Sequence, residues 1–371
     1  MYIEDCCEIL DSMRVPITAS DREEGDYPYY GANGIQDHVA DYIFDDELVL
    51  LAEDGGNFGS KEKPIAYRVS GKCWINNHAH VLKPKIGLDV DYLCYSLMFY
   101  NVDGMVNGAT RQKLTQAAMR KMQIPSRSIE DQKHIVDELN RIVKIKEQRF
   151  LELQLLDKLI KARFVEMFGD CSNMVLLNDL CLIITDGTHQ PPKFQEKGIP
   201  FILVSNLSNN TVTYNTEKYI SEETYNELYK RTPIEPGDLL LSTVGSYGHP
   251  AVVTEDIRFL FQRHIAYLRP KRELVNSFYL HSALLAPDGQ RQIEEKVKGI
   301  AQKTLNLSEI RKIMIPLPKM EEQDKFAAFV HQVDKSKLLS LIKLLEQLIT
   351  YLYNIFIIYR QDKGEEVEDH E

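Results

Sequence analysis

The sequence contains the stretch Gly108-Ala-Thr-Arg-Gln-Lys-Leu-Thr-Gln-Ala-Ala-Met-Arg-Lys-Met-Gln-Ile-Pro125, and the same pattern returns as Gly299-Ile-Ala-Gln-Lys-Thr-Leu-Asn-Leu-Ser-Glu-Ile-Arg-Lys-Ile-Met-Ile-Pro316. The two stretches align without a gap at an offset of 191 residues, so that Leu114 matches Leu305. Upstream, residues 77–85 parallel residues 263–271 in the same order. Because two matched blocks in the same order are hard to obtain by chance, we infer an internal duplication.

A long segment without proline and rich in helix-forming residues follows each Ile-Pro pair. We expect helices over residues 129–168 and from 320 to about 360, each roughly 60 Å long at 1.5 Å per residue. Helices of this length cannot be buried by a small domain, so we predict that the two pair with each other as an antiparallel coiled coil. The alternative, that each helix packs only on its own domain, stays open.

Apolar residues in both segments recur in alternating steps of three and four, the spacing of a coiled-coil seam. In the second segment we expect the pattern to shift after Lys337, so that the apolar stripe rotates along the helix. The predicted seam residues are Ile135, Leu139, Ile142, Leu153, Leu156, Ile160, Phe326, Val330, Val333, Leu341, Leu345, Leu348 and Leu352, with the polar Lys146 and Arg149 in the same row.

The segments outside these helices contain short apolar runs typical of buried strands, at residues 48–52, 199–204 and 238–242. We therefore predict an α+β fold in which two mixed α/β domains are separated by two long helices that form an antiparallel coiled coil, as a tandem repeat with pseudo-twofold symmetry. The expected order is a first domain at 1–128, a helix at 129–169, a second domain at 170–318, a helix at 319–361 and an acidic tail at 362–371.

Charge is distributed unevenly along the 371 residues, whose net charge is -11. Residues 1–60 hold 15 acidic residues against Arg14 and Arg22, so the rest of the chain is close to neutral. Basic strips without acids occur at 104–129 and 257–272, and such strips are compatible with nucleic-acid binding. Six cysteines without a Cys-x-x-Cys pair, the lack of a secretion signal and the lack of a long apolar span favour a cytoplasmic protein without a membrane helix.

The order of globular segment, long helix, globular segment, long helix resembles the specificity subunits of type I restriction-modification enzymes, over nearly the whole chain. Local sequence agrees with this resemblance. The first domain contains Tyr27-Pro-Tyr-Tyr-Gly-Ala-Asn-Gly-Ile35 and Val49-Leu-Leu-Ala-Glu-Asp-Gly55, and the second contains Asp186-Gly-Thr-His189, Gly198-Ile-Pro-Phe-Ile202 and Gly237-Asp-Leu-Leu-Leu-Ser-Thr-Val-Gly-Ser-Tyr-Gly248.

The resemblance implies that each domain is a target recognition domain that reads one half of a bipartite, asymmetric site in double-stranded DNA. It implies that the helices fix the gap between the halves, that two methyltransferase subunits dock alongside, and that restriction (translocase) subunits attach to that core. It also implies a non-catalytic chain with no bound cofactor or metal, since S-adenosylmethionine, ATP and magnesium belong to the partner subunits.

Candidate DNA-binding residues follow from the duplicated basic loop, from other loops and from the resemblance. Arginine and lysine hold phosphates and also reach base edges, although a solvated basic loop is the plainer interpretation. The candidates are Asn33, Asn57, Lys61, Thr110, Arg111 and Lys113 in the first domain, and His189, Lys193, Asn206, Ser246, Tyr247, His249, Gln302 and Lys303 in the second. The matching histidines His78 and His264 are expected to share a structural role.

Two other classes of function remain as alternatives: a self-sufficient DNA nuclease or methyltransferase, and a coiled-coil adaptor that does not bind DNA. The sequence has no Gly-x-x-x-x-Gly-Lys-Ser/Thr phosphate loop and no Asn/Asp-Pro-Pro-Tyr/Phe motif, which disfavours ATPase and methyltransferase chemistry in this chain. Pro287-Asp288 followed by Glu294-Glu295-Lys296 is similar to a nuclease pattern, but its carboxylates would lie on one helix.

Overall fold

The computed structural model describes residues 1–108, 111–207, 209–299 and 303–361, and the side chains from 352 to 361 lie outside that description. The chain divides into two compact units, the first built from residues 1–147 and the segment from 344 onward, the second from residues 148–343. Both long helices pass from one unit into the other. The predicted domain boundaries at 128, 169 and 318 instead follow the helix ends, so they stay predictions, and the predicted tail at 362–371 lies outside the described residues.

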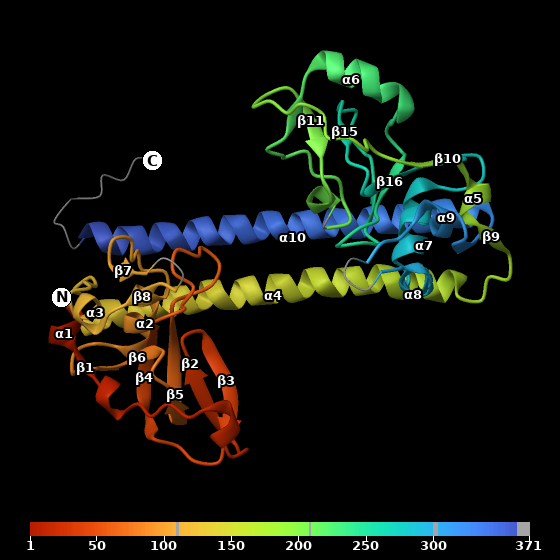
Figure 1. Ribbon diagram of the computed structural model, residues 1–371. Coiled ribbons are helices and arrows are strands. Elements are labelled where there is room, and N and C mark those ends of the chain that lie inside the picture. The colour runs from red at the N-terminus through yellow and green to blue at the C-terminus, as the bar shows by residue number, and fades with distance from the viewer. Residues whose placement is uncertain (109–110, 208, 300–302, 362–371) are drawn as a thin grey trace. The chain divides into compact units, whose positions relative to one another are not determined.

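The two long helices are α4 (Ile129–Phe168) and α10 (Met320–Gln361), which confirms both predicted helices (Figure 1). Each begins with two acidic residues in its first turn, where carboxylates stabilise the positive end of the helix dipole. Within the described residues, no helix has both the length and the apolar content that a membrane span needs.

The first unit is built on a sheet of six strands in the order β1-β6-β4-β5-β2-β3. Its central strand β4 ends in five consecutive residues, Leu48 to Ala52, that are fully buried, as predicted from the apolar run. The pairings are antiparallel except for β2 with β5. The elements of this unit are α1 (Ile3–Cys6), β1 (Cys7–Ile9), β2 (Tyr27–Gly31), β3 (Gly34–Val39), β4 (Phe44–Ala52), β5 (Ala66–Ile75), β6 (Ala79–Pro84), α2 (Val90–Met98), β7 (Val106–Asn107), β8 (Lys113–Leu114) and α3 (Gln116–Arg120), with short 3-10 turns at Asp11–Met13 and Ala19–Asp21.

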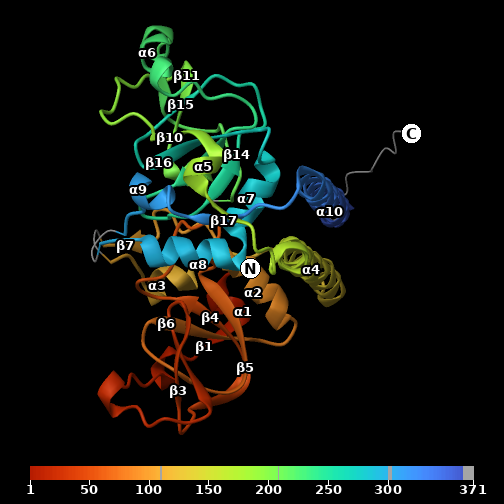
Figure 2. The ribbon, with the colours of Figure 1, turned by 90° about the vertical axis from the view of Figure 1, so that its right-hand side faces the viewer.

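The second unit contains a four-stranded sheet in the order β10-β16-β13-β14, a three-stranded sheet β12-β11-β15 and the pair β17-β9. Figure 2 shows its strands together with the shorter helices α5 to α9. The elements are β9 (Met174–Leu176), α5 (Leu177–Leu180), β10 (Cys181–Asp186), β11 (Ile199–Ile202), β12 (Tyr219–Ile220), α6 (Glu222–Leu228), β13 (Leu239–Ser242), β14 (Pro250–Val252), β15 (Leu260–Phe261), β16 (Ile265–Pro270), α7 (Ser277–Leu285), α8 (Pro287–Lys296), α9 (Leu307–Ile310) and β17 (Met314–Pro316), with 3-10 turns at Val204–Leu207 and Tyr229–Arg231.

The internal duplication is visible in matching hydrogen bonds. The Tyr92 hydroxyl donates to the Pro125 carbonyl at 3.2 Å, and the Tyr279 hydroxyl donates to the Pro316 carbonyl at 2.7 Å. The backbone amide of Leu114 donates to the carbonyl of Glu53 at 2.7 Å, and that of Leu305 donates to Thr243 at 2.8 Å. The two halves therefore share one folding unit, as the repeat predicts, and Glu53 occupies the position that Thr243 has in the second half.

Within the second unit, the two long helices pair in antiparallel fashion. The ring centroids of Phe164 and Phe326 are 5.4 Å apart, the Lys337 ammonium is 2.7 Å from the Asp157 carboxylate, and the Ser340 hydroxyl donates to Glu152 at 2.9 Å. The residue numbers of the contacting partners therefore decrease along α4 as they increase along α10. This arrangement confirms the predicted antiparallel pairing for that part of the helices.

The predicted shift of the apolar stripe in α10 is wrong. Leu341 and Leu345, which were expected in the seam, are 43% and 59% exposed, whereas Ser340 is buried and Leu344 is half-buried. The original register therefore continues past Val333 through Lys337 and Ser340. Polar residues can occupy the seam there because Asp157 and Glu152 on α4 satisfy their hydrogen bonds.

The remaining predicted seam residues differ in how deeply they are buried. Phe326 and Val330 belong to the core of the second unit, with Ile160 packed against it, and Ile135 packs against the core of the first unit. Val333 is buried, and Arg149 is half-buried and forms an ion pair with Glu152, whereas Lys146 is exposed. The half-buried members of the row are Leu139, Ile142, Leu153, Leu156 and Leu348, while the side chain of Leu352 lies outside the described residues.

Candidate nucleic-acid interface

In the first unit, a loop that follows β4 gathers several of the predicted DNA-binding residues. The Asn33 amide donates to the carbonyl of Gly55 at 3.0 Å, and the Arg111 guanidinium donates to the Asp54 carboxylate at 2.8 Å. Gly55 has a φ of +62°, and a Cβ there would lie 3.2 Å from Nε of Arg111, so the close approach of the arginine needs glycine at this position. Asn57 and Lys61 lie on the same loop, half-buried and exposed respectively.

The duplicated basic loop is attached to this β4 loop by charge pairs. The Lys113 ammonium is 2.9 Å from the Glu53 carboxylate, and the amide of Gly55 donates to the carbonyl of Gln112 at 3.1 Å. Asp54 also lies 2.7 Å from Nδ1 of His78. The predicted residues Arg111, Lys113 and Asn33 are thus brought together, while Thr110 lies outside the described residues.

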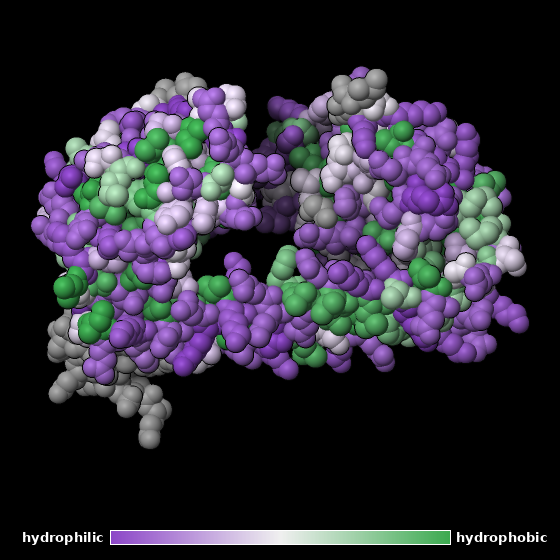
Figure 3. All heavy atoms as spheres, turned by 90° about the horizontal axis from the view of Figure 1, so that it is seen from below, coloured by the Kyte–Doolittle hydropathy of each residue, from purple (hydrophilic) through white to green (hydrophobic). Residues whose placement is uncertain are grey.

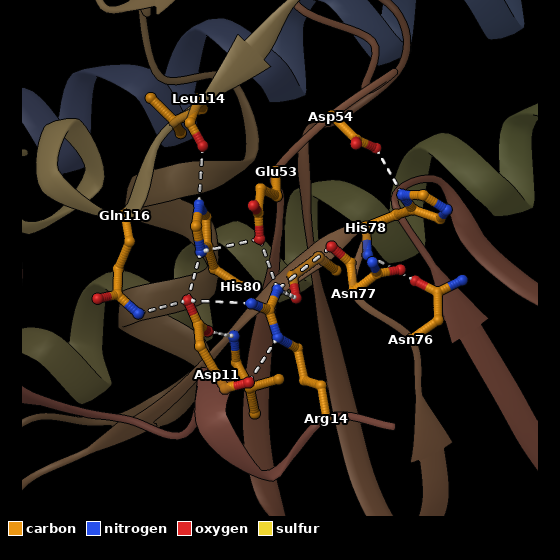
Figure 4. Close-up of polar contacts among 12 residues, drawn as sticks. Asp11, Arg14, Glu53, Asp54, Asn76, Asn77, His78, His80, Leu114 and Gln116 are labelled. Carbon is orange, nitrogen blue, oxygen red and sulfur yellow. Dashed lines mark hydrogen bonds and ion pairs between the residues drawn. The ribbon is translucent and has the colours of Figure 1, made fainter. Parts of the chain in front are cut away.

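Behind these contacts is a charge cluster formed by the buried Asp11, Glu53 and His80 and the half-buried Arg14 (Figure 4). Arg14 pairs with Glu53 at 2.6 Å and donates to the carbonyl of Ala79 at 2.7 Å. His80 places Nδ1 at 2.7 Å from Asp11 and Nε2 at 2.9 Å from the carbonyl of Leu114. The cluster therefore connects the N-terminal segment, β4, β6 and the end of the basic loop.

Both carboxyl groups of the cluster are stabilised in their ionised form. Burial opposes the charge on Asp11, but hydrogen bonds from His80, Gln116 and the Val81 amide hold its pKa below the usual value. Burial likewise opposes the charge on Glu53, but its bonds to Arg14 and Lys113 lower the pKa. Ionised carboxylates accept hydrogen bonds only, so Nδ1 of His80 donates to Asp11 and Nε2 donates to the Leu114 carbonyl.

The same cluster has metal-ligand residue types, because ligand atoms of Asp11, Glu53 and His80 lie within 4.8 Å of one another. A histidine binds a metal ion through a nitrogen lone pair, but both ring nitrogens of His80 are already engaged in hydrogen bonds with oxygen atoms. Arg14 and Lys113 supply positive charge next to Glu53. These contacts favour a role in holding the basic loop over a role in binding a cation.

In the second unit, predicted residues meet at the loop between β13 and β14. Lys303 lies 2.9 Å from the Glu294 carboxylate of α8 and 3.3 Å from the hydroxyl of Tyr247, which itself donates to Glu294. His249 is half-buried, and its Nδ1 donates to Oδ1 of Asn210 at 3.0 Å. Ser246 is exposed in the same loop. Tyr247 and Lys303 are thus brought together around one carboxylate, and Gln302 lies outside the described residues.

Two further candidates lie after β10. Nε2 of His189 is 2.8 Å from Asp186, whose other oxygen is 3.0 Å from Arg231, and Lys193 is exposed in the segment that follows. This group adjoins a polar pocket with a volume of about 310 Å³ that Asp186, Thr243 and His264 help to line. Burial and the neighbouring Arg263 lower the pKa of His264, so this ring is neutral at pH 7.

Asn206 is a correction to the predicted site. Its side chain is buried, with Oδ1 accepting from the Leu203 amide at 3.0 Å and Nδ2 donating to the carbonyls of Thr213 at 3.0 Å and Asn215 at 2.9 Å. These bonds use the amide to hold its own loop together, so Asn206 is not available to read DNA. Asparagine in a loop forms such local turns as readily as it binds a ligand.

The nuclease-like pattern on α8 also has a structural explanation. Arg291 forms ion pairs with Asp288 and with Glu295, the latter at 2.7 Å, while Glu294 faces Lys303. The carboxylates are therefore divided between two cations instead of converging on one point. Glu53, Asp54 and Glu294 also belong to the interface but were not predicted from the sequence, although Glu53 and Asp54 directly follow the apolar run of β4.

The histidines His78 and His264 share a backbone role, as predicted. The carbonyl of His78 accepts from the Glu53 amide at 2.9 Å, and that of His264 accepts from the Thr243 amide at 2.9 Å. Their side chains differ, because the His78 ring faces Asp54 whereas the His264 ring accepts from Nε of Arg263 at 3.2 Å.

The chain is a tandem protein that contains two copies of one folding unit, and each copy is followed by a long helix. Each copy carries an exposed basic loop and thus a candidate nucleic-acid interface. The family model described as the type I restriction modification DNA specificity domain matches residues 1–155 and 172–350. The chain therefore belongs to this family, and the resemblance seen in the sequence is confirmed.

Named relatives agree. The chain is 26% identical over 348 residues to the type I restriction enzyme specificity subunit S.HindORF215P of Haemophilus influenzae, which covers 90% of this chain and 86% of the relative. It is 32% identical over 147 residues to the EcoBI specificity subunit of Escherichia coli, which covers 40% of this chain and 31% of that one.

Solved structures show the same fold. The S subunit of a type I restriction-modification system from M. genitalium has a TM-score of 0.54 at 13% identity, covering 96% of this chain and 95% of that one. A chain from a study of complex assembly and conformational transition of the type I R-M system has a TM-score of 0.55 at 15% identity, covering 97% and 96%.

Proposed function

We propose that this chain reads a bipartite, asymmetric site in double-stranded DNA as the specificity subunit of a type I restriction-modification system. The observation that carries the proposal is the double family match, in which each matched half contains a recognition unit and a long helix. Two different recognition units on one duplicated framework are suited to two different half-sites. A helix of roughly 60 Å corresponds to about 18 base pairs at 3.4 Å per pair, which leaves room for two short half-sites and a gap.

The chain itself is proposed to be non-catalytic and to act in the cytoplasm. Two methyltransferase subunits and the restriction (translocase) subunits would supply the chemistry, with S-adenosylmethionine, ATP and magnesium bound to them. This assignment is supported by the charge pairs that occupy the carboxylates of the nuclease-like α8 pattern. It is also supported by the hydrogen bonds that occupy both ring nitrogens of His80, in the one cluster of metal-ligand types among the described residues.

The long helices carry an exposed apolar surface that supports docking of the partner subunits there. Leu151, Leu155 and Leu159 are each about half exposed along one face of α4 and line an apolar groove with Gln148 and Leu156. Figure 3 shows hydrophobic side chains gathered along the face of the long helices that is turned to the viewer. Contiguous exposed apolar rows of this kind mark protein interfaces, so we assign the methyltransferase subunits to the helices.

The test is to produce the chain with and without its methyltransferase partner and to map methylated bases on genomic DNA. We expect methylation only with the partner, at a split motif with a fixed gap. Inserting one base pair into the gap of a target should abolish its methylation. Methyl transfer or cleavage by the chain alone would establish the enzyme alternative, and methylation patterns unchanged by deleting this chain would favour an adaptor without DNA binding.

A further inference from the structure

Three exposed cations of the two candidate interfaces are already paired with carboxylates. Arg111 is held by Asp54 at 2.8 Å and Lys113 by Glu53 at 2.9 Å in the first unit, while Lys303 is held by Glu294 at 2.9 Å in the second. The side chains of these three cations remain 59%, 49% and 54% exposed, so a phosphate group can reach each of them.

The carboxylates that pair with these cations do not occupy equivalent positions in the two copies of the duplicated unit. The backbone hydrogen bonds that match the two halves place Thr243 at the position of Glu53. The following residues, Asp54 and Val244, form the equivalent β-bridges to Lys113 and Thr304. The second unit thus lacks both acids at the matching positions, and its carboxylate comes from α8 instead. The same pairing has arisen from unrelated parts of the fold.

From this repeated pairing we infer that Asp54 and Glu294 act as stand-ins for DNA phosphate, which keep the basic loops neutral and suppress sequence-independent DNA binding. The inference rests on the proposed function. In the free protein each of these three cations is matched by a carboxylate, and the DNA backbone has to replace that carboxylate. Backbone contacts alone, which every DNA sequence offers, then yield less net binding energy. A correct half-site adds base contacts to these same phosphate contacts and therefore still binds. The carboxylates thus lower the affinity for random DNA and recognise no base themselves.

Local electrostatics gives the expected size of the effect. An exposed ion pair contributes little by itself, and a carboxylate left beside a bound phosphate adds a repulsion comparable to one such pair. We therefore expect Glu294→Gln to raise the affinity of the full-length chain for a random-sequence duplex by about threefold to tenfold in 50 mM salt. Asp54→Asn should act in the same direction through Arg111.

A matched control is available in the second unit. Glu222 pairs with Arg258, and their side chains are 58% and 59% exposed, close to the values for Glu294 and Lys303. Glu222 lies on α6, at the end of the second unit away from α8 in both ribbon views (Figures 1 and 2). Glu222→Gln changes the net charge equally but should alter the affinity less than twofold, because Arg258 is not among the candidate DNA-binding residues and salt screens exposed charges that lie apart from the bound phosphates.

The measurement is fluorescence anisotropy with a labelled duplex over a series of salt concentrations. Lys303→Gln should weaken binding and reduce the salt slope by about one, and Glu294→Gln should then have no effect in the Lys303→Gln background. If Lys303→Gln weakens binding while Glu294→Gln leaves it unchanged, or if Glu222→Gln raises it equally, the stand-in role is overturned and DNA binding at this loop stands. If neither Lys303→Gln nor Arg111→Gln weakens binding, the proposed DNA contact itself fails.

Discussion

Gln132 and Gln323 make the same three hydrogen bonds in the two halves of the chain. Oε1 of Gln132 accepts from the Asp89 amide at 2.8 Å, and Oε1 of Gln323 accepts from the Asn276 amide at 2.9 Å. In each copy Nε2 donates to two backbone carbonyls, and both side chains are fully buried. One amide therefore ties the first turn of a long helix to the N-cap of α2 in the first copy and of α7 in the second, and this fixes how each recognition unit is attached to its helix.

Replacing this amide should be costly. Gln323→Leu leaves one backbone amide and two backbone carbonyls without partners in a buried place, so we expect the free energy of unfolding to fall by about 2–4 kcal/mol. Urea denaturation followed by circular dichroism measures the change. Gln332→Leu, at an exposed position of the same helix, is the control and should change stability by less than about 0.5 kcal/mol. Equal stability of the two variants would contradict the role of Gln323.

The register of α10 can be tested at two neighbouring leucines. Leu344 is half-buried in the observed register, and Leu345 is 59% exposed. Leu344→Ala should therefore lower the free energy of unfolding by about 1–2 kcal/mol, and Leu345→Ala by less than about 0.5 kcal/mol. Thermal or urea unfolding of the two variants measures this difference. The opposite order would restore the shifted register that the sequence pattern alone predicts.

The apolar row on α4 should matter for assembly more than for stability. Leu155→Ser removes an exposed apolar side chain, so the isolated chain should unfold as wild type does. Its affinity for the methyltransferase subunit should fall by tenfold or more, because truncating a central interface residue often costs 1–2 kcal/mol or more. Analytical ultracentrifugation or calorimetry with the purified partner measures the loss. Leu182→Ser, at another exposed leucine on β10, is the control, and an equal loss of affinity there would argue against a docking site on α4.

Acid should weaken the first unit through Asp11. Because its folded pKa lies below the unfolded value of about 3.9, the ionised form contributes stability that is complete above that value and is lost as pH falls through the folded pKa. Asp11→Asn should therefore lower the free energy of unfolding by about 2–4 kcal/mol at pH 7, with the difference from wild type shrinking below about pH 4. Urea denaturation at several pH values measures this. Asp103→Asn, at an exposed aspartate, should leave the whole profile unchanged, and a pH-independent difference for Asp11→Asn would exclude the charge as its cause.

The long helices and the duplication could be predicted from the sequence because both depend on local features. The helical periodicity of apolar residues in a 40-residue segment without proline can be seen in the sequence itself, and the matched Ile-Pro blocks record the repeat directly. The register of α10 could not be predicted, because Lys337 and Ser340 remain in the seam only through partners on another helix.

The candidate site shows the same division between local and tertiary information. Arg111, Lys113 and Lys303 were found from the repeated loop, but their carboxylate partners were not. Glu53 is separated from Lys113 by about sixty residues of sequence, and the pair forms only when β4 and β8 meet. Asn206 was chosen from its loop and is excluded by hydrogen bonds that only the folded loop contains.

The charge cluster of Asp11, Arg14, Glu53 and His80 belongs to the first half only, since Thr243 and Val244 stand where the second half would need acids. The second half has a buried charge of its own at another place, because the fully buried Asp238 pairs with Arg269 at 3.0 Å. Because the two sets of buried charges are separate, a substitution in one set weakens one recognition unit and leaves the other able to hold its half of the target.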